Sequence, residues 1–353
     1  MSVKKQEGSL NLLKLLATCI IILHHFQQSS GLSFEGKLNF YGGSFYWGHL
    51  VELFFILSGY VMYKYSGSLD LDAGFFPFFK KRYTRFLPLL MITGVTSGLM
   101  ALWRASIEGT IFTHTMWTLL GGMSGFGRIL SSNTVINNPT WYISILLWCY
   151  AVFYFVTSIA KHRNLHPNSM YLLTMFVGII TYYVCKEYDF SMPFFSSYIG
   201  RGLICFFEGL LLRELFEKTK IHEKPLYIIV SLVYLIGFIF IFVKHKAFVS
   251  DQLYYIICFT VFPCVILLFK SKAMSMLCAH QVFSVIGNIS YHTFMWHITV
   301  IRLLLNICAI LDVATEDIKL KLMLITLLAA FAVGTLSCYV GRITSSRLKR
   351  YAT

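Results

Sequence analysis

Charged residues are scarce in this chain, and acidic residues are the scarcest of them. Aspartate and glutamate together number 16 of 353 residues, and all charged types make up only 13%. A soluble protein of this length needs far more charge to cover its surface, so composition excludes a soluble fold. Cysteine occurs nine times, but the nine are dispersed and form no CxxC pair. This spacing predicts neither a zinc site nor a disulfide framework.

Hydrophobic residues make up 57% of the chain, and apolar runs of membrane-spanning length recur along it. We predict an all-α integral membrane protein, a bundle of about ten transmembrane helices with cytoplasmic N- and C-termini. The predicted spans cover residues 10–26, 45–65, 86–103, 141–160, 169–185, 196–213, 226–243, 252–269, 282–310 and 322–341.

The net charge of +14 is distributed as in a membrane protein rather than a nucleic-acid-binding protein. With alternating connections, nineteen lysines and arginines fall in cytoplasmic segments, eight outside and three within spans. This asymmetry is typical of an even number of spans with both ends inside. We expect residues 1–353 to form a single membrane domain in the bacterial cytoplasmic membrane, with no appended soluble domain and no nucleic-acid partner. The first apolar segment lacks a small-x-small cleavage site, so we interpret it as a retained span.

Two ionisable residues occupy the first predicted span. Lys14 and His25 are eleven residues apart, which places them on one helix face about 16 Å from each other along the axis. Ionisable groups inside a membrane span are costly and usually functional. This pair is the strongest functional signal in the sequence.

A carboxylate follows at a matching depth. Glu52 lies about five residues into the second span, counted from the same outer face as His25. Consecutive antiparallel helices usually pack as neighbours, so we expect Glu52 to orient the His25 imidazole as a general base requires. The alternative is a buried ion pair that merely joins two helices. For His25 alone, a packed hydrogen-bonding histidine is the competing interpretation.

A basic cluster begins the third span at its cytoplasmic end. Lys80, Lys81, Arg82 and Arg85 occur in FFKKRYTRFLP, and the two arginines are one helical turn apart. Paired guanidinium groups match phosphate oxygens, so the cluster predicts an anionic cytoplasmic cosubstrate. Anchoring to anionic lipid is the alternative.

Further polar residues within or beside predicted spans are candidates for a tunnel or an acceptor site, and each could instead only join helices. These are Trp141, Tyr142, Ser144, Arg201, Glu208, Ser290, Tyr291 and His297. We expect Trp141 and Tyr142 to suit the headgroup level as interfacial anchors.

Five segments in order resemble acyltransferase family 3, a family of integral membrane O-acyltransferases. They are LNLLKLLATCIIILHHF, WGHLVELFFILSGYVM, FFKKRYTRFLP, NNPTWYISILLWCYAVFY and IGNISYHTFMWHITVI, spread over residues 10–301. The register of the first selects His25 rather than His24. Lys14 stands where the family usually has Arg, Glu52 where it has Asp, and Leu146 where many members have Glu. The last segment picks out His297.

The resemblance implies transfer of an acyl group, commonly acetyl from acetyl-CoA, to a hydroxyl of a cell-surface polysaccharide or lipid-linked glycan. Lys81, Arg82 and Arg85 would hold the CoA phosphates, the donor would extend along Lys14, and His25 would deprotonate the acceptor with Glu52 holding its ring. A transient acyl-imidazole is the competing route. We expect acyl-CoA as a cosubstrate, membrane lipid as the surroundings, and no bound cofactor or metal.

A multispanning transporter or flippase of a glycan or lipid-linked precursor is the main alternative, because intramembrane His, Glu and Arg also form proton relays. Matched halves with Gly- or Pro-interrupted spans, typical of repeat-built transporters, are not found in the sequence. A lipid-linked sugar polymerase and a non-catalytic scaffold are weaker alternatives.

Overall fold

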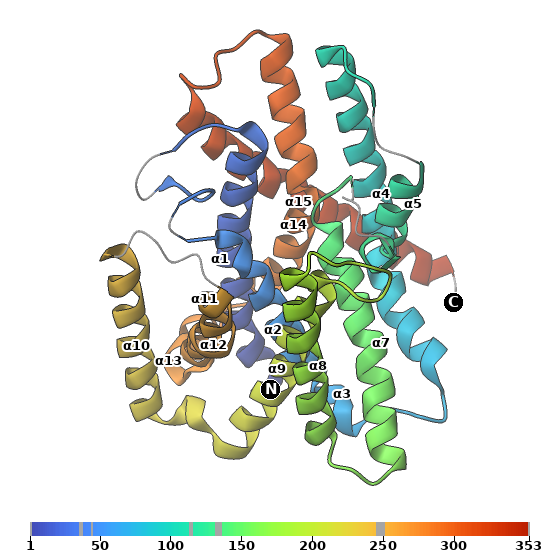
Figure 1. Ribbon diagram of the computed structural model, residues 1–353, viewed down its shortest axis with the longest axis vertical. Helices are drawn as coiled ribbons and strands as arrows, with labels where there is room; N and C mark the ends of the chain where they lie inside the picture. Colours follow the sequence, from blue (N-terminus) through green and yellow to red (C-terminus); the bar gives the residue numbers. More distant parts are fainter. Residues whose placement is uncertain are drawn as a thin grey trace. The chain divides into compact units, whose positions relative to one another are not determined.

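The structure is a computed structural model that describes residues 2–34, 38–43, 45–112, 116–130, 136–244 and 251–351. Throughout these ranges the regular secondary structure is helical, and the pairing of Met192 with Phe195 is an isolated bridge. The predicted all-α class is therefore confirmed (Figure 1).

The described ranges contain the following helices. In chain order they are α1 (Ser2–Ser30), η2 (Trp47–His49), α2 (Leu50–Met62), α3 (Lys64–Gly67), α4 (Phe75–Glu108), α5 (Met116–Ser124), α6 (Gly127–Leu130), α7 (Thr140–His162), α8 (Pro167–Glu187), α9 (Ser197–Thr219), η3 (Ile221–Glu223), α10 (Pro225–Lys244), α11 (Asp251–Ile256), the π-helix η4 (Ile257–Val261), α12 (Phe262–Lys270), α13 (Lys272–Leu277), α14 (Val282–Ile310) and α15 (Lys319–Tyr351).

Seven helices in the described ranges are long and apolar enough to cross a membrane. They are Gly8–Ser30, Phe75–Glu108, Thr140–His162, Pro167–Glu187, Leu253–Lys270, Val282–Ile310 and Lys319–Thr344. Each coincides with one of the predicted spans, because an apolar run of this length is a strong signal in sequence.

The other three predicted spans correspond to helices that are shorter or more charged. α2 has 13 residues and is about 20 Å long, less than the roughly 30 Å of a bilayer's hydrocarbon core. α9 carries Arg201 and Glu208 within its apolar sequence, and the described apolar part of α10 is limited to Pro225–Ile241. The total of ten spans and the cytoplasmic placement of the termini stay predictions.

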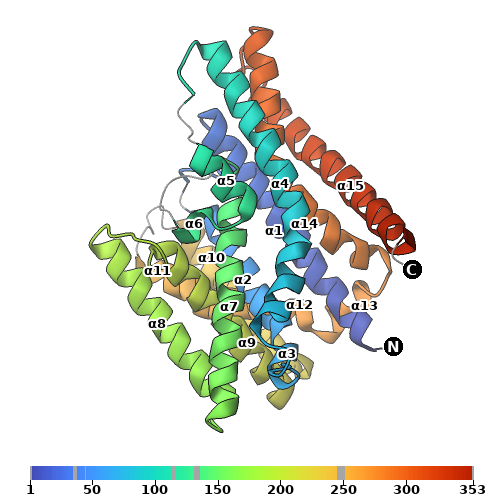
Figure 2. The ribbon, with the colours of Figure 1, turned by 90° about the vertical axis from the view of Figure 1, so that its right-hand side faces the viewer.

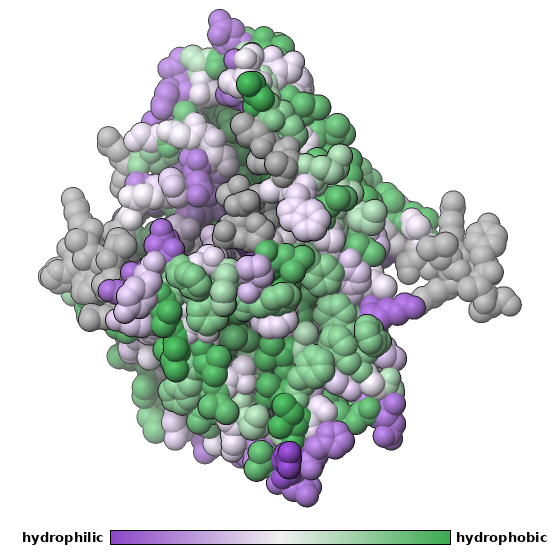
Figure 3. Space-filling view, turned by 45° about the vertical axis from the view of Figure 1, so that its right-hand side comes forward, coloured by the Kyte–Doolittle hydropathy of each residue, from purple (hydrophilic) through white to green (hydrophobic). Residues whose placement is uncertain are grey.

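Apolar side chains are exposed in stripes on the outside of the protein. On α8, Leu172, Phe176 and Ile180 recur at every fourth position and are each more than 40% exposed. Figure 3 shows hydrophobic residues spread over large areas of the face turned to the viewer. A soluble monomer rarely exposes continuous apolar surface of this kind, whereas lipid covers it. The protein is therefore a multi-pass membrane protein.

The helices divide into two compact units. Unit 1 comprises residues 1–48, 93–113 and 272–353, and unit 2 comprises residues 49–92 and 114–271. Helix α4 contributes its first part to unit 2 and its second part to unit 1. The expectation of a single membrane domain stays a prediction.

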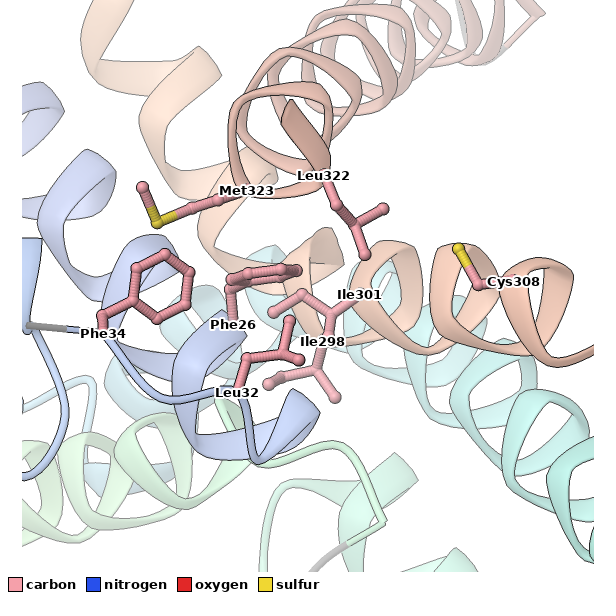
Figure 4. Packing of buried hydrophobic residues seen from close by; sticks show 8 residues of the cluster. All are labelled: Phe26, Leu32, Phe34, Ile298, Ile301, Cys308, Leu322 and Met323. Carbon is pink, nitrogen blue, oxygen red and sulfur yellow. The ribbon is translucent and has the colours of Figure 1, made fainter. Parts of the chain in front are cut away.

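In unit 1, helix α14 packs against both α1 and α15. Figure 4 shows Phe26 of α1 and Ile298 and Ile301 of α14 meeting Leu322 of α15. Close approach of α15 requires Gly334, because a Cβ there would overlap the Thr293 side chain of α14. This packing fixes the residues of α1 just before Phe26 against the middle of α14.

In unit 2, helix α9 packs against both α2 and α8, which lie beside it in both ribbon views (Figures 1 and 2). Two glycines allow the backbones of α2 and α9 to approach closely. A Cβ on Gly59 would overlap the carbonyl oxygen of Phe206, and a Cβ on Gly209 would overlap that of Ile56. Small residues at crossing points of this kind are typical of membrane helix pairs.

The α2–α9 crossing gives a stability test. Gly209→Val should lower the free energy of unfolding by about 1–3 kcal/mol or more, because the new side chain must displace backbone atoms. Gly237→Ala on α10, where a Cβ meets nothing within 4 Å, is the matched control and should be neutral or slightly stabilising. Unfolding in detergent micelles measures both, and equal stability of the two variants would contradict this packing.

Candidate active site

His25 of α1 contacts His297 of α14 inside unit 1. The His25 Nδ1 atom lies 2.8 Å from the His297 Nε2 atom, and the two rings are nearly parallel with centroids 5.0 Å apart. His25 is 8% exposed and His297 is fully buried. Both residues were predicted site residues, but the sequence did not predict that they pair. The packing of Phe26 against Ile298 and Ile301 brings them together.

The carbonyl oxygen of Phe294 determines which nitrogen of His297 carries a proton. It can only accept a hydrogen bond, and His297 Nδ1 lies 2.6 Å from it, so Nδ1 donates. In a neutral ring Nε2 is then the acceptor, and His25 Nδ1 must donate the bond between the rings. His25 Nε2 consequently bears the lone pair, which a general base uses to take a proton.

His24 has a different role from its neighbour. Its Nδ1 atom donates to the Phe40 carbonyl at 2.7 Å, and its ring meets those of Tyr41 and Tyr46 edge-on. One turn later, Gln27 donates to the Leu38 carbonyl and accepts from the backbone N–H groups of Phe40 and Tyr41. These two side chains attach residues 38–41 to the end of α1. The two adjacent histidines therefore have different partners, and the choice of His25 over His24 stays a prediction.

The other predicted site residues of unit 1 lie on α1 and α14. Lys14 is half-buried on the same helix as His25, so their predicted shared face is confirmed by the continuous α1. Ser290 is buried and donates to the Ile286 carbonyl within its own helix. Tyr291 is half-buried beside it. This bond lies within α14 and does not join Ser290 to another helix.

Glu52 of α2 forms an ion pair with Arg201 of α9 inside unit 2. Arg201 Nε lies 2.6 Å from Glu52 Oε1, the carboxylate has no exposed surface, and His49 Nδ1 lies 3.9 Å from the same oxygen. Both partners were predicted site residues, and again the pairing was not predicted. The close α2–α9 crossing at Gly59 and Gly209 holds the helices that carry them. The expected orientation of His25 by Glu52 would join the two units, and it stays a prediction.

Aromatic rings surround the Arg201 guanidinium. Its centre lies 4.8 Å from the Trp141 ring and 5.7 Å from the Tyr198 ring. Arg128 of α6 lies over Tyr198 at 4.2 Å, and burial lowers the pKa of the Arg128 guanidinium. Sequence reasoning missed Arg128 and Tyr198, because an arginine in a Gly- and Asn-rich connection reads as a solvated loop residue. The resulting cluster holds two guanidinium groups, one carboxylate and two aromatic rings.

The remaining predicted residues of α7 are packed inside unit 2. Trp141 and Tyr142 are each 7% exposed, so they contact protein instead of serving as exposed interfacial anchors. The Tyr142 hydroxyl bonds Ser58 Oγ at 3.0 Å. Ser144 is fully buried, and its hydroxyl has no hydrogen-bond partner within the described ranges. On α9, Glu208 is also buried, and its Oε2 atom has no partner in the same part of the chain.

The basic cluster lies on the part of α4 that belongs to unit 2. Lys81 and Arg85 are exposed, whereas Arg82 is half-buried. The Arg82 guanidinium covers the Phe78 ring at 3.5 Å and donates to the Phe78 carbonyl at 2.9 Å. Arg82 therefore contributes to local packing, and Arg85 and Lys81 present their charge to the surroundings.

The fold, with its long apolar helices and buried polar pairs, is that of a helical membrane protein. A family model described as an acyltransferase domain matches residues 7–342, nearly the whole chain. The chain therefore belongs to acyltransferase family 3 and is a membrane acyltransferase. No match was found among curated proteins or among solved structures.

The Glu52–Arg201 pair predicts strong energetic coupling. Glu52→Gln or Arg201→Gln alone leaves a buried charge without its partner and should cost about 3–5 kcal/mol of stability. The double variant should cost clearly less than the sum of the two. Chemical unfolding in mixed micelles gives the four free energies of this double-mutant cycle.

The surface pair Arg104–Glu108 provides the control, since its side chains are 42% and 44% exposed. Its coupling should be about 0–1 kcal/mol because water screens exposed charges. Equal coupling in the two cycles would contradict a buried ion pair at Glu52.

Proposed function

We propose that this protein moves an acyl group from cytoplasmic acyl-CoA to a hydroxyl of an extracytoplasmic surface polysaccharide or lipid-linked glycan. Acetyl is the acyl group that we favour. The reaction would take place at the cytoplasmic membrane of a bacterium. The observation that carries the proposal is the His25–His297 pair, whose hydrogen bonds leave the lone pair on His25 Nε2. Membership of an acyltransferase family supplies the reaction class.

In the proposed step, His25 Nε2 takes the proton of the acceptor hydroxyl. The hydroxyl oxygen attacks the thioester carbonyl, the carbon–sulfur bond breaks, and the CoA thiolate leaves with the proton from the imidazolium. His297 holds the ring of His25 in the required tautomer and so acts as a positioning residue. Glu52 stands at the position of the family's Asp, and Arg201 keeps its carboxylate ionised and oriented.

The donor would be held by its phosphates. Arg85 and Lys81 are exposed basic residues one turn apart on α4, and their charge and spacing suit a polyanion such as CoA. Arg82 contributes positive charge while its guanidinium is also committed to Phe78. Lys14, on the His25 helix, remains the expected contact for the extended part of the donor.

His25→Ala should lower acyl transfer about 10²–10⁴-fold, the usual contribution of a positioned general base. The matched control is His292→Gln, which changes a half-buried histidine of α14 that bonds Ser337 instead of a site residue. Mass spectrometry of surface-glycan esters in a deletion strain carrying each variant measures the effect. Wild-type acetylation by a well-expressed His25→Ala variant would reject the assignment.

The competing acyl-imidazole route gives a different observation in the same protein. Acyl-CoA added without acceptor would leave an acyl group on the His25 peptide after a rapid quench. Direct transfer leaves that peptide unmodified.

Arg85→Ala should raise the KM for acyl-CoA about tenfold with little change in kcat, since a phosphate contact contributes to ground-state binding. Arg163→Ala, at the exposed end of α7, is the control and should leave both constants unchanged. Steady-state kinetics on the purified protein measure this. An unchanged KM in Arg85→Ala would remove this residue from the donor site.

A transporter or flippase is the second candidate function, favoured by the buried Glu52–Arg201 pair and by Glu208. It requires movement of a glycan or lipid-linked precursor without consumption of acyl-CoA. Release of free CoA that depends on the presence of acceptor would exclude it.

A further inference from the structure

Helix α14 presents a second polar face, distinct from the one that carries His297. Thr299, Arg302 and Asn306 recur at spacings of three and four residues and contact the part of α4 that belongs to unit 1. Thr299 Oγ1 bonds Ser97 Oγ at 3.1 Å, and Asn306 Nδ2 donates to the Met100 carbonyl at 3.1 Å. Arg302 lies between these two contacts.

Within the described part of the chain, no acidic side chain balances the charge of Arg302. Its Nη1 atom donates to the Ser97 carbonyl at 3.3 Å, and no carboxylate of the described ranges lies within ion-pair distance. One long hydrogen bond uses one of the five N–H groups of the guanidinium. A cation within a membrane-spanning helix is costly unless it is paired, so this arrangement is complete only with an anionic ligand.

The position of Arg302 restricts what that ligand can be. Arg302 precedes the end of α14 by eight residues, or about 12 Å of helix. It follows His297 by five residues, or about 7.5 Å, toward the end predicted to be extracytoplasmic. An anion that reaches this depth must be carried by a molecule with a hydrocarbon anchor. A phosphate ester fits, because guanidinium groups bind phosphate oxygens in a bidentate manner.

We propose that Arg302 binds the phosphate of a membrane-embedded phosphate ester, and that this ester is the lipid-linked saccharide on which the enzyme acts. The inference rests on the proposed acyltransferase function and narrows its acceptor to lipid-linked intermediates. The headgroup of a glycerophospholipid offers the same phosphate chemistry and is the other source that the experiment must distinguish.

The test measures phosphate-bearing lipid that copurifies with the full-length protein from its host in mild detergent. Mass spectrometry quantifies each lipid per protein for wild type, Arg302→Lys and Arg302→Gln. Arg302→Gln should retain at least about tenfold less of a saccharide phosphate lipid, since charge-assisted hydrogen bonds are lost. Arg302→Lys should retain an intermediate amount, because a lysine keeps the charge without the bidentate geometry.

Arg104→Gln is the matched control. Arg104 lies on the part of α4 that Arg302 contacts, but its side chain is exposed and paired with Glu108. It should retain the wild-type amount. Equal retention in Arg302→Gln and Arg104→Gln would overturn the proposal. Retention of glycerophospholipid alone, sensitive to Arg302, would overturn the assignment to the acceptor. If Arg302→Gln does not fold, Arg302→Lys is compared with wild type. Less bound saccharide phosphate lipid in Arg302→Lys supports the proposal, and an equal amount overturns it.

The measurement is independent of acyl transfer. His25→Ala should lose glycan acetylation and still retain the saccharide phosphate lipid, because this variant keeps Thr299, Arg302 and Asn306, the α14 residues that contact α4. If Arg302→Gln loses the saccharide phosphate lipid while His25→Ala is fully active, the phosphate site is supported and the proposed role of His25 is rejected. If Arg302→Gln retains the wild-type amount of this lipid while His25→Ala is inactive, the role of His25 is supported and the phosphate site is rejected.

Discussion

Burying a polar group away from water is costly unless it has a hydrogen-bond partner, and this constraint explains the main polar pair of each unit. In unit 1 the partner of His25 is His297, and in unit 2 the partner of Glu52 is Arg201. Each pair joins two helices whose contact is made close by small or apolar residues around it. The helix packing and the polar pairs therefore support each other.

Sequence reasoning located most of the helices but did not pair their polar residues. Hydropathy over a span is local information, and seven predicted spans coincide with helices long enough to cross a membrane. His25 and His297 are separated by 272 positions, and Glu52 and Arg201 by 149. The assumption that consecutive helices pack together linked Glu52 to His25. It carried no information about α14 or α9, which supply the partners observed within each unit.

Some residues were misinterpreted or missed because two environments have the same sequence signature. An aromatic pair at the start of a span is typical of interfacial anchors, yet Trp141 and Tyr142 are packed inside unit 2 beside Arg201 and Ser58. An arginine in a glycine-rich connection is typical of a solvated loop, yet Arg128 is buried over Tyr198. Arg201 and Tyr198 come from α9 and Ser58 from α2, so every one of these partners is distant in sequence. The family resemblance, in contrast, depended on short local motifs and was confirmed over residues 7–342.

The choice of histidine as the direct partner of His25 has a chemical consequence. A carboxylate beside an imidazole stabilises the imidazolium by full charge, whereas a second neutral imidazole fixes the tautomer and supplies only a dipole. In the proposed step His25 takes a proton on Nε2, its Nδ1 proton would shift toward His297 Nε2, and the Phe294 carbonyl would stabilise the positive charge that His297 then shares. Sharing the charge between two rings would stabilise the imidazolium, whereas burial of both rings would destabilise it. Because the site holds no carboxylate in direct contact with His25 among the described hydrogen bonds, the proposed reaction would pass the proton on to the leaving thiolate.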